Sequence, residues 1–328
     1  GLKVSCSGSL GWSAQASLTC FVPPTSIHSS TFPPYIKLPD DTTFSGEIKA
    51  ESTFNFNKMQ PAGTLTFDLA NGTLINNENI LSDINFRVNL PNLPLIESSP
   101  SQICTIGSLK FGKFAMTNGL VHFRVEDARS IFLEKVRLNW CGGKVETGSF
   151  RLSSRKKEFE TTLYCDRLHF TKLLDQFGIE NTEGEGSLNG RLPISISRDS
   201  IQFDDGFLFS TPGNSGIVRF NNTDQLREGL PGMSQAAYLD YSMKAMENFS
   251  YNWTKLSFNS QNEELLITMQ LDGKPAEPLP FGYKEGHIVP RSAGPGLQHP
   301  IRLDVNFRLP LQNMFRYGKN IQSFMENM

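Results

Sequence analysis

The sequence contains no apolar run close to the roughly 20 residues that a helix needs to cross a bilayer. It also opens without the basic and apolar pattern of a secretory signal peptide. We therefore expect the chain as given to be soluble.

An excess of charge of one sign is missing as well. The 31 Lys and Arg residues nearly balance the 33 Asp and Glu residues, for a net charge of -2 with histidine neutral. This balance provides no field that would gather nucleic acid or anionic head groups over the whole surface, so we expect no nucleic-acid partner. The one basic cluster, at residues 155–157, fits a solvated hairpin tip better than a binding patch.

Catalytic and metal-binding motifs are scarce. Only Cys165 and His169 have the i, i+4 spacing of a helical metal pair, and two ligands do not make a site, so we expect no metal and no cofactor. There is no P-loop and no G-x-S-x-G elbow. The adjacent Asp204 and Asp205 would point to opposite faces of a strand. We expect a noncatalytic protein, because an active site would need carboxylates, Cys or His from distant parts of the sequence to converge.

The five cysteines are too widely spaced for the usual paired zinc-ligand patterns. Cys6 and Cys20 flank a segment of hairpin length and are the first candidates for a disulfide in an oxidising compartment. The odd number leaves at least one free thiol. The alternative is that all five are buried as small apolar side chains.

What the sequence does have is phenylalanine in strand patterns. Its 25 Phe residues outnumber the 7 Tyr and 3 Trp combined, and apolar residues alternate with polar ones in many short segments. Turn residues such as Asn71-Gly72 and Asn118-Gly119 separate these segments. The pattern predicts a mainly β fold, a long curved antiparallel sheet in the form of an open half-pipe or a sandwich, with a few short helices.

Three segments have helical patterns. In the first, at 168–177, apolar side chains fall on one face and Gly178 can end the helix. The other two lie near 234–249 and 311–328.

A ribbon of strands follows the first helix. From Ser187 the period of apolar residues changes to two. Turn residues at Arg198-Asp199 and at Asp204-Asp205-Gly206 divide the ribbon. These features predict three short strands joined as an antiparallel meander.

An ordered series of segments carries a resemblance to a known family. The series is FTKLLDQFGI, GEGSLNGRLPISIS, DSIQFDDGFLFSTPG and GIVRF, then FSYNWTKLSFN, LLITMQLDGKP and IRLDVNFRLPLQNMF. It is similar to the C-terminal part of the YdbH family, AsmA-like proteins of the bacterial envelope, whereas matches before Leu168 are limited to strand rhythm. We therefore divide the chain into an N-terminal β-rich part of an elongated sheet, 1–165, and a YdbH-like C-terminal β domain, 166–328.

The resemblance implies a function. It implies a noncatalytic periplasmic module of a bridge that carries phospholipid between the inner and outer membranes. It also implies an anchor to the inner membrane by an N-terminal segment outside this sequence, and a small outer-membrane lipoprotein that adds a strand at the C-terminal end. A dicarboxylate-transport role, also attached to such domains, ranks lower because no Arg or Lys cluster offers an obvious carboxylate site.

The apolar strand faces are the candidate lipid site, since each buried methylene contributes about 0.8 kcal/mol and a groove needs no polar motif. The candidate groove residues are Phe54, Phe56, Leu65, Phe67, Phe123, Leu192, Ile194, Ile196, Phe203, Phe207, Phe209, Ile267, Met269, Leu303, Val305 and Phe307. The alternative is a surface or secreted β-sandwich with a closed core that binds glycan or protein.

Overall fold

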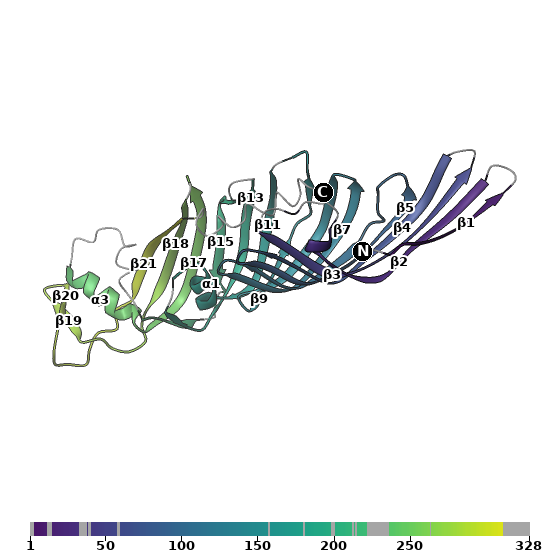
Figure 1. Cartoon of the computed structure of the whole chain (residues 1–328). Helices are drawn as coiled ribbons and strands as arrows, with labels where there is room; N and C mark the ends of the chain where they lie inside the picture. Colours follow the sequence, from purple (N-terminus) through teal and green to yellow (C-terminus); the bar gives the residue numbers. More distant parts are fainter. Residues whose placement is uncertain are drawn as a thin grey trace.

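The computed structural model of the chain is an elongated open sheet (Figure 1). It describes residues 3–11, 15–32, 38, 41–57, 60–156, 158–179, 181–197, 201–211, 213, 215–221, 236–262 and 264–310. Within these residues, 19 strands join one antiparallel sheet that does not close on itself, and two short α-helices lie against it. The expected mainly β fold, a long open antiparallel sheet, is confirmed.

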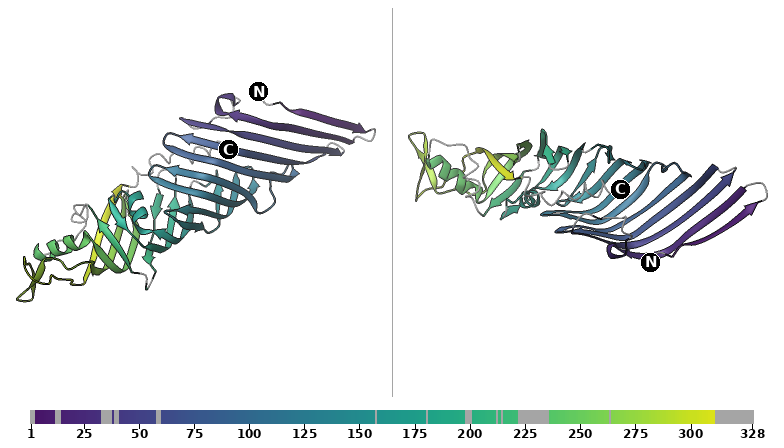
Figure 2. Two further views of the ribbon diagram at one scale, coloured as in Figure 1. Left: turned by 90° about the horizontal axis from the view of Figure 1, so that it is seen from below. Right: turned by 45° about the horizontal axis from the view of Figure 1, so that its top comes forward.

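In the N-terminal half, each strand pairs with the next strand along the chain (Figure 2). The strands are β1 (Ser5–Gly11), β2 (Gln15–His28), β3 (Thr42–Asn57), β4 (Gln60–Asn76), β5 (Asn79–Leu93), β6 (Gln102–Phe111), β7 (Phe114–Asp127), β8 (Ser130–Trp140) and β9 (Gly143–Thr147). Tight turns join many of them. The β8–β9 turn, for example, has Cys141 and Gly142 at φ of 47° and 76°, the left-handed values that such hairpin turns require.

In the C-terminal half, six strands continue the sheet from β9 in the order β11, β13, β15, β17, β18 and β21. These six are β11 (Phe159–His169), β13 (Ser187–Ile196), β15 (Gly206–Ser210), β17 (Phe249–Gln261), β18 (Glu264–Pro275) and β21 (Ile301–Pro310). Four shorter strands complete the sheet: β10 (Phe150–Ser153) pairs with β8, β14 (Ile201–Phe203) with β13, β16 (Gly216–Phe220) with β17, and β12 (Thr182–Gly184) with β16. The hairpin of β19 (Phe281–Lys284) and β20 (His287–Pro290) forms a separate small sheet.

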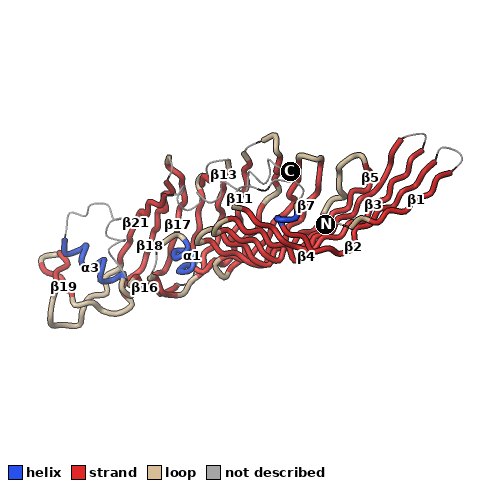
Figure 3. The backbone as a smooth tube through the Cα atoms, viewed as in Figure 1, coloured by secondary structure: helices blue, strands red, loops and turns tan. Residues whose placement is uncertain are grey.

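The helices lie at the middle and at one end of the sheet (Figure 3). Helix α1 (Phe170–Gln176) directly follows β11, and the amide of Gly178, at φ 83°, donates to Asp175 O at 2.9 Å just beyond it. Helix α3 (Ala236–Met246) lies within the segment expected near 234–249. The helix expected at 311–328 lies outside the described residues.

Strand β11 crosses the expected domain boundary between residues 165 and 166, and the sheet continues through it. The division into two domains stays a prediction.

Irregularities in several strands shift the alternation of side chains. At such a bulge one strand carries an extra residue, so the residues before and after it change faces. In three bulges the N–H of a left-handed residue donates to an asparagine of a neighbouring strand: Asn71 to Asn85 Oδ1 at 2.9 Å, Arg167 to Asn189 Oδ1 at 2.9 Å, and Asp205 to Asn259 Oδ1 at 3.0 Å. Each asparagine satisfies an amide that the bulge removes from the regular ladder.

The predicted meander after α1 is wrong at its second turn. Strands β14 and β15 both pair with β13, one after the other along its length, so Asp204 and Asp205 do not reverse the chain. They form a bulge instead, with Asp205 at φ 50°. The bulge explains the error, because the Asp and Gly residues that favour hairpin turns also favour the left-handed conformation of a bulge.

Candidate functional site

The two faces of the sheet differ in chemistry. We call the inner face the one that carries the buried side chains of β17 and β18, such as Leu256 and Met269, and the outer face the opposite one. Residues directly opposite each other on neighbouring antiparallel strands share a face, so the inner face can be followed from strand to strand by register. It is apolar over most of its length.

We call the inner face of strands β3 to β8 the trough. One row across it pairs Leu69 with Phe86, Phe86 with Cys104 and Cys104 with Val121. The rings of Phe67 and Phe86 lie 5.9 Å apart. Most apolar side chains of the trough are half-buried: Phe54, Leu65, Phe67, Leu74, Phe86, Val88, Ile106, Leu109, Val121, Leu133 and Leu138. The trough is therefore a continuous apolar surface that is only partly covered.

The outer face opposite the trough carries ion pairs. Arg87 pairs with Asp68 across β4 and β5, and Lys135 and Arg137 both pair with Glu146. The hydrogen bond from Lys135 is the largest cause that holds the pKa of Glu146 below its usual value. These pairs are exposed and contribute little to stability. They make the sheet amphipathic, with charge on one side and hydrocarbon on the other.

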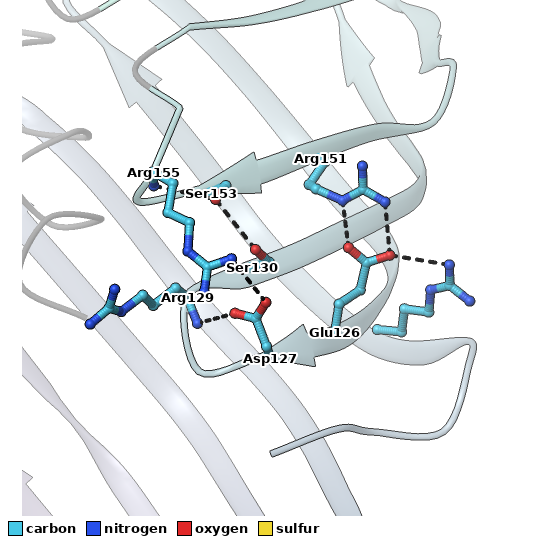
Figure 4. Close-up of polar contacts among 8 residues, drawn as sticks. Glu126, Asp127, Arg129, Ser130, Arg151, Ser153 and Arg155 are labelled. Carbon is cyan, nitrogen blue, oxygen red and sulfur yellow. Dashed lines mark hydrogen bonds and ion pairs between the residues drawn. The ribbon is translucent and has the colours of Figure 1, made fainter. Parts of the chain in front are cut away.

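A second outer-face cluster lies on β7, β8 and β10 (Figure 4). Glu126 accepts hydrogen bonds from Arg151 and Arg124, and the bond from Arg151 is the largest cause that lowers its pKa. Both guanidinium groups also lie over the ring of Phe132, at 5.0 Å and 5.6 Å from its centre. The cluster covers an outer-face aromatic ring with charge.

The trough ends at α1. The ring of Phe177, just past this helix, lies 5.4 Å from Phe114, 6.3 Å from Trp140 and 5.6 Å from Phe258. Trp140 Nε1 donates a hydrogen bond to Gln176 Oε1 at 2.6 Å. The helix therefore seals the inner face where the N-terminal strands meet β17.

Beyond α1 the inner face is a closed core. Met269, Leu271, Leu303 and Val305 of β18 and β21 have 0% exposure. At the far end, the Oη of Tyr241 on α3 accepts a hydrogen bond from His299 N at 2.6 Å, which ties α3 to the segment after β20. A closed core, which the alternative prediction of a β-sandwich expects for the whole chain, is thus found only in the C-terminal part.

The structure divides the predicted groove residues among four places. In the trough lie Phe54, Phe56, Leu65, Phe67 and Phe123. In the closed core, between 0% and 8% exposed, lie Leu192, Phe203, Ile267, Met269, Leu303, Val305 and Phe307. At the margin of this core, half-buried, lie Ile194 and Ile196, and on the outer face lie Phe207 and Phe209.

The outer-face position of Phe207 and Phe209 follows from the register. They pair with Arg191 and Asn189, whereas Leu208 between them has 0% exposure and faces the core. Phe207 is flanked by the cations of Arg191 and Lys255, at 5.4 Å and 6.0 Å from its ring centre. These two residues are not part of the trough.

The cysteines fall into two groups. Cys6 and Cys20 lie directly opposite each other on β1 and β2 and are joined by a disulfide bond. Cys104, Cys141 and Cys165 are free, and burial raises the pKa of their thiols to about 11, 12 and 12. Thiols with such raised pKa values are poor nucleophiles.

No cluster of three or more His, Cys, Asp or Glu residues is placed to hold a metal ion in the part of the chain that the structure describes. Cys165 is buried, whereas His169, which follows the bulge in β11, is exposed. None of the helices in the described ranges is long and apolar enough to cross a bilayer.

The chain was compared with known proteins. Searches of curated protein sequences and of solved structures each returned no match. One family model, described as YdbH-like, intermembrane phospholipid transport protein YdbH, matches residues 14–316. Because this match covers nearly the whole chain, including both the trough and the closed core, the chain belongs to the YdbH-like family of intermembrane phospholipid transport proteins.

Proposed function

We propose that the trough holds the acyl chains of phospholipid while the outer face stays in water. The observation that carries this proposal is the contrast between the half-buried apolar rows of β3 to β8 and the ion pairs directly behind them. A single-layer sheet in water normally covers its apolar face with another layer. In the described residues, the single-turn 3-10 helix Ser29–Thr31 contacts β3, and apart from it no second layer of strands or helices covers β3 to β5, so hydrocarbon from a ligand is the natural cover.

Packing at α1 defines how far lipid extends. Beyond α1 the inner-face side chains of β18 and β21, such as Met269 and Val305, have 0% exposure, so the closed core acts as the end of the lipid path in this conformation. Acyl chains therefore lie N-terminal to α1, along strands that run obliquely to the long axis of the molecule (Figure 2).

The test is to replace one residue at a time with a photoreactive phenylalanine analogue. Substitution at Phe67, in the trough, is expected to cross-link phospholipid in bacterial cells. Substitution at Phe209, on the outer face, is the matched control and is expected to give no lipid adduct. Native mass spectrometry with lipid extraction then identifies the bound species. A lipid-free protein, with no adduct at Phe67, contradicts the proposal.

The membership in this family supports a wider proposal for the cellular role. The chain is a noncatalytic module of a periplasmic bridge, anchored to the inner membrane by a segment outside this sequence, that carries phospholipid toward or from the outer membrane. Cysteine reactivity in fractionated bacteria tests the location, since Cys6 and Cys20 stay linked only in an oxidising compartment.

A small outer-membrane lipoprotein is the proposed partner, bound by strand addition. Among the described strands, β21 pairs only with β18, so its other edge offers backbone groups to an added strand. A photoreactive residue at the exposed Asn306 of β21 is expected to capture the lipoprotein. The same residue at the exposed Ser7 of β1 is the control, and capture at Ser7 but not at Asn306 contradicts strand addition at the C-terminal end.

A further inference from the structure

Two segments at one edge of the trough form a single basic surface, which we call the basic rim. It consists of the β7–β8 turn, residues 127–130, and the segment at the end of β10, residues 153–156. Ser154 N donates to Arg129 O at 3.0 Å, and the hydroxyls of Ser130 and Ser153 are hydrogen-bonded at 3.3 Å. Both turns are therefore held in one place relative to the trough.

The basic rim has more cations than its carboxylate can neutralise. Arg129, Arg155 and Lys156 are all exposed. Asp127 Oδ1 accepts a hydrogen bond from Arg129 N at 2.6 Å, and Asp127 Oδ2 forms an ion pair with Arg155 Nη1 at 3.8 Å, so the one carboxylate of the rim is already engaged. Within the described ranges, no carboxylate lies at ion-pairing distance from the side chains of Arg129 or Lys156.

This arrangement differs from the outer face nearby. There Glu126 is already occupied by Arg151 and Arg124, so it is not available to the rim. Figure 4 shows the guanidinium of Arg129 extending away from the pair formed by Arg151 and Glu126. The rim cations thus present open hydrogen-bond donors to the solvent.

Hydrocarbon lies directly beside these cations. The last inner-face row before the turns pairs Val125 with Ile131 and Ile131 with Leu152, all half-buried. In the next row the ring of Phe150 stacks on Phe159, with centres 5.2 Å apart and planes 7° apart. An apolar surface that ends at three exposed cations and one carboxylate matches an amphiphile with an anionic head group.

We propose that the basic rim binds the phosphate of a phospholipid whose acyl chains lie on the inner face of β7, β8 and β10. The inference rests on the proposed function and adds the position of the head group to it. A guanidinium presents paired N–H donors that match phosphate oxygens, and a lysine ammonium adds a point charge. The rim therefore orients the lipid across the trough, with its head group at the edge.

The experiment compares two lipids that have the same acyl chains. Phosphatidylglycerol carries a head-group phosphate, and diacylglycerol does not. The variant combines Arg129→Gln, Arg155→Gln and Lys156→Gln. The control variant combines Lys274→Gln, Lys284→Gln and Arg291→Gln, which removes the same number of exposed positive charges at a distance from the trough.

We expect wild-type protein and the control variant to bind phosphatidylglycerol more tightly than diacylglycerol. The rim variant should lose affinity for phosphatidylglycerol by on the order of tenfold and keep its affinity for diacylglycerol, because each cation near an anionic head group contributes modestly. A rim variant that keeps the full preference for phosphatidylglycerol overturns the inference and leaves the trough intact as a lipid site.

Inorganic phosphate separates a lipid site from a free-phosphate site. If it binds wild-type protein as tightly as phosphatidylglycerol does, and the rim variant abolishes that binding, the rim is a free-phosphate site and the head-group assignment is wrong. If wild-type protein binds neither lipid, the proposed function itself fails.

Discussion

The backbone N–H of Asp205 donates a hydrogen bond to Asn259 Oδ1 at 3.0 Å, from the bulge between β14 and β15 to the neighbouring β17. This bond holds the one-residue shift that turns Leu208 toward the core and Phe207 and Phe209 toward the outer face. The side chain of Asn259 thus helps to determine which aromatic residues lie on the inner face of the sheet.

Removing that acceptor should weaken the bulge. Asn259→Leu leaves the amide of Asp205 without its partner, so we expect a loss of about 1 kcal/mol in the free energy of unfolding. Gln261→Leu, at the exposed end of the same strand, is the control and should change stability less. Urea unfolding followed by circular dichroism measures both. Equal effects would show that the Asn259 acceptor has no special role.

Charged substitutions should have different effects in the trough, on the outer face and in the closed core. Phe67→Asp, in the trough, should abolish lipid binding and leave the protein folded, because a half-buried carboxylate keeps access to water. Phe209→Asp, on the outer face, should leave both properties nearly unchanged. Met269→Asp should unfold the C-terminal core, because the residue has 0% exposure. Thermal unfolding and lipid retention are measured together, and loss of folding in Phe67→Asp would mean that the trough is a closed core.

The seal at α1 should depend on its aromatic contacts. Phe177→Ala removes a buried ring that contacts Phe114, Trp140 and Phe258, at a cost of about 3–5 kcal/mol. Gln176→Ala removes only the acceptor for Trp140 Nε1 and should cost about 1 kcal/mol. Hydrogen exchange should show the loss of protection around α1 in Phe177→Ala and not in β3 or β4. A uniform loss across the sheet would contradict a local seal.

The buried thiols should make stability fall at alkaline pH. Burial raises the pKa of Cys141 and Cys165 from 9.0 to about 12, so the folded protein keeps protons that the unfolded chain releases above pH 9. The free energy of unfolding should therefore decrease between pH 9 and pH 12, by at most about 1.4 kcal/mol per pH unit for each thiol. The variant with Cys141→Ala and Cys165→Val should show a shallower decrease in urea titrations at several pH values. An identical slope would rule out the thiols as its source.

The sequence is a good guide to elements that keep a regular period. The alternation in β17 and β18 and the apolar face of α1 are visible in the order of residues, and the structure contains these elements. Bulges are harder to detect, because Asn71, Asp83 and Asp205 belong to the residue types that also begin hairpin turns. One extra residue changes the face of everything after it, so Phe207 and Phe209 lie on the outer face, where the alternation that begins at Ile201 and Phe203 predicts the inner one.

The extent of the trough could not be read from the pattern of single strands. Leu65 and Met269 both sit in regular alternating strands, yet one is half-buried in the trough and the other is fully buried in the core. The difference arises from what lies above each residue. For Met269 the cover belongs to a core that α1, α3 and several strands share, and such long-range packing leaves no local signal.

From β1 to β9 every strand of the sheet lies beside its immediate neighbour in the sequence. Adding or removing one hairpin between β1 and β7 changes the reach of the molecule by at most two strand spacings, roughly 10 Å, and leaves the strand pairs of the C-terminal half in place. The length of such a sheet can therefore change in units of one hairpin. The distance that it spans is then set by the number of hairpins and not by the strength of any single contact.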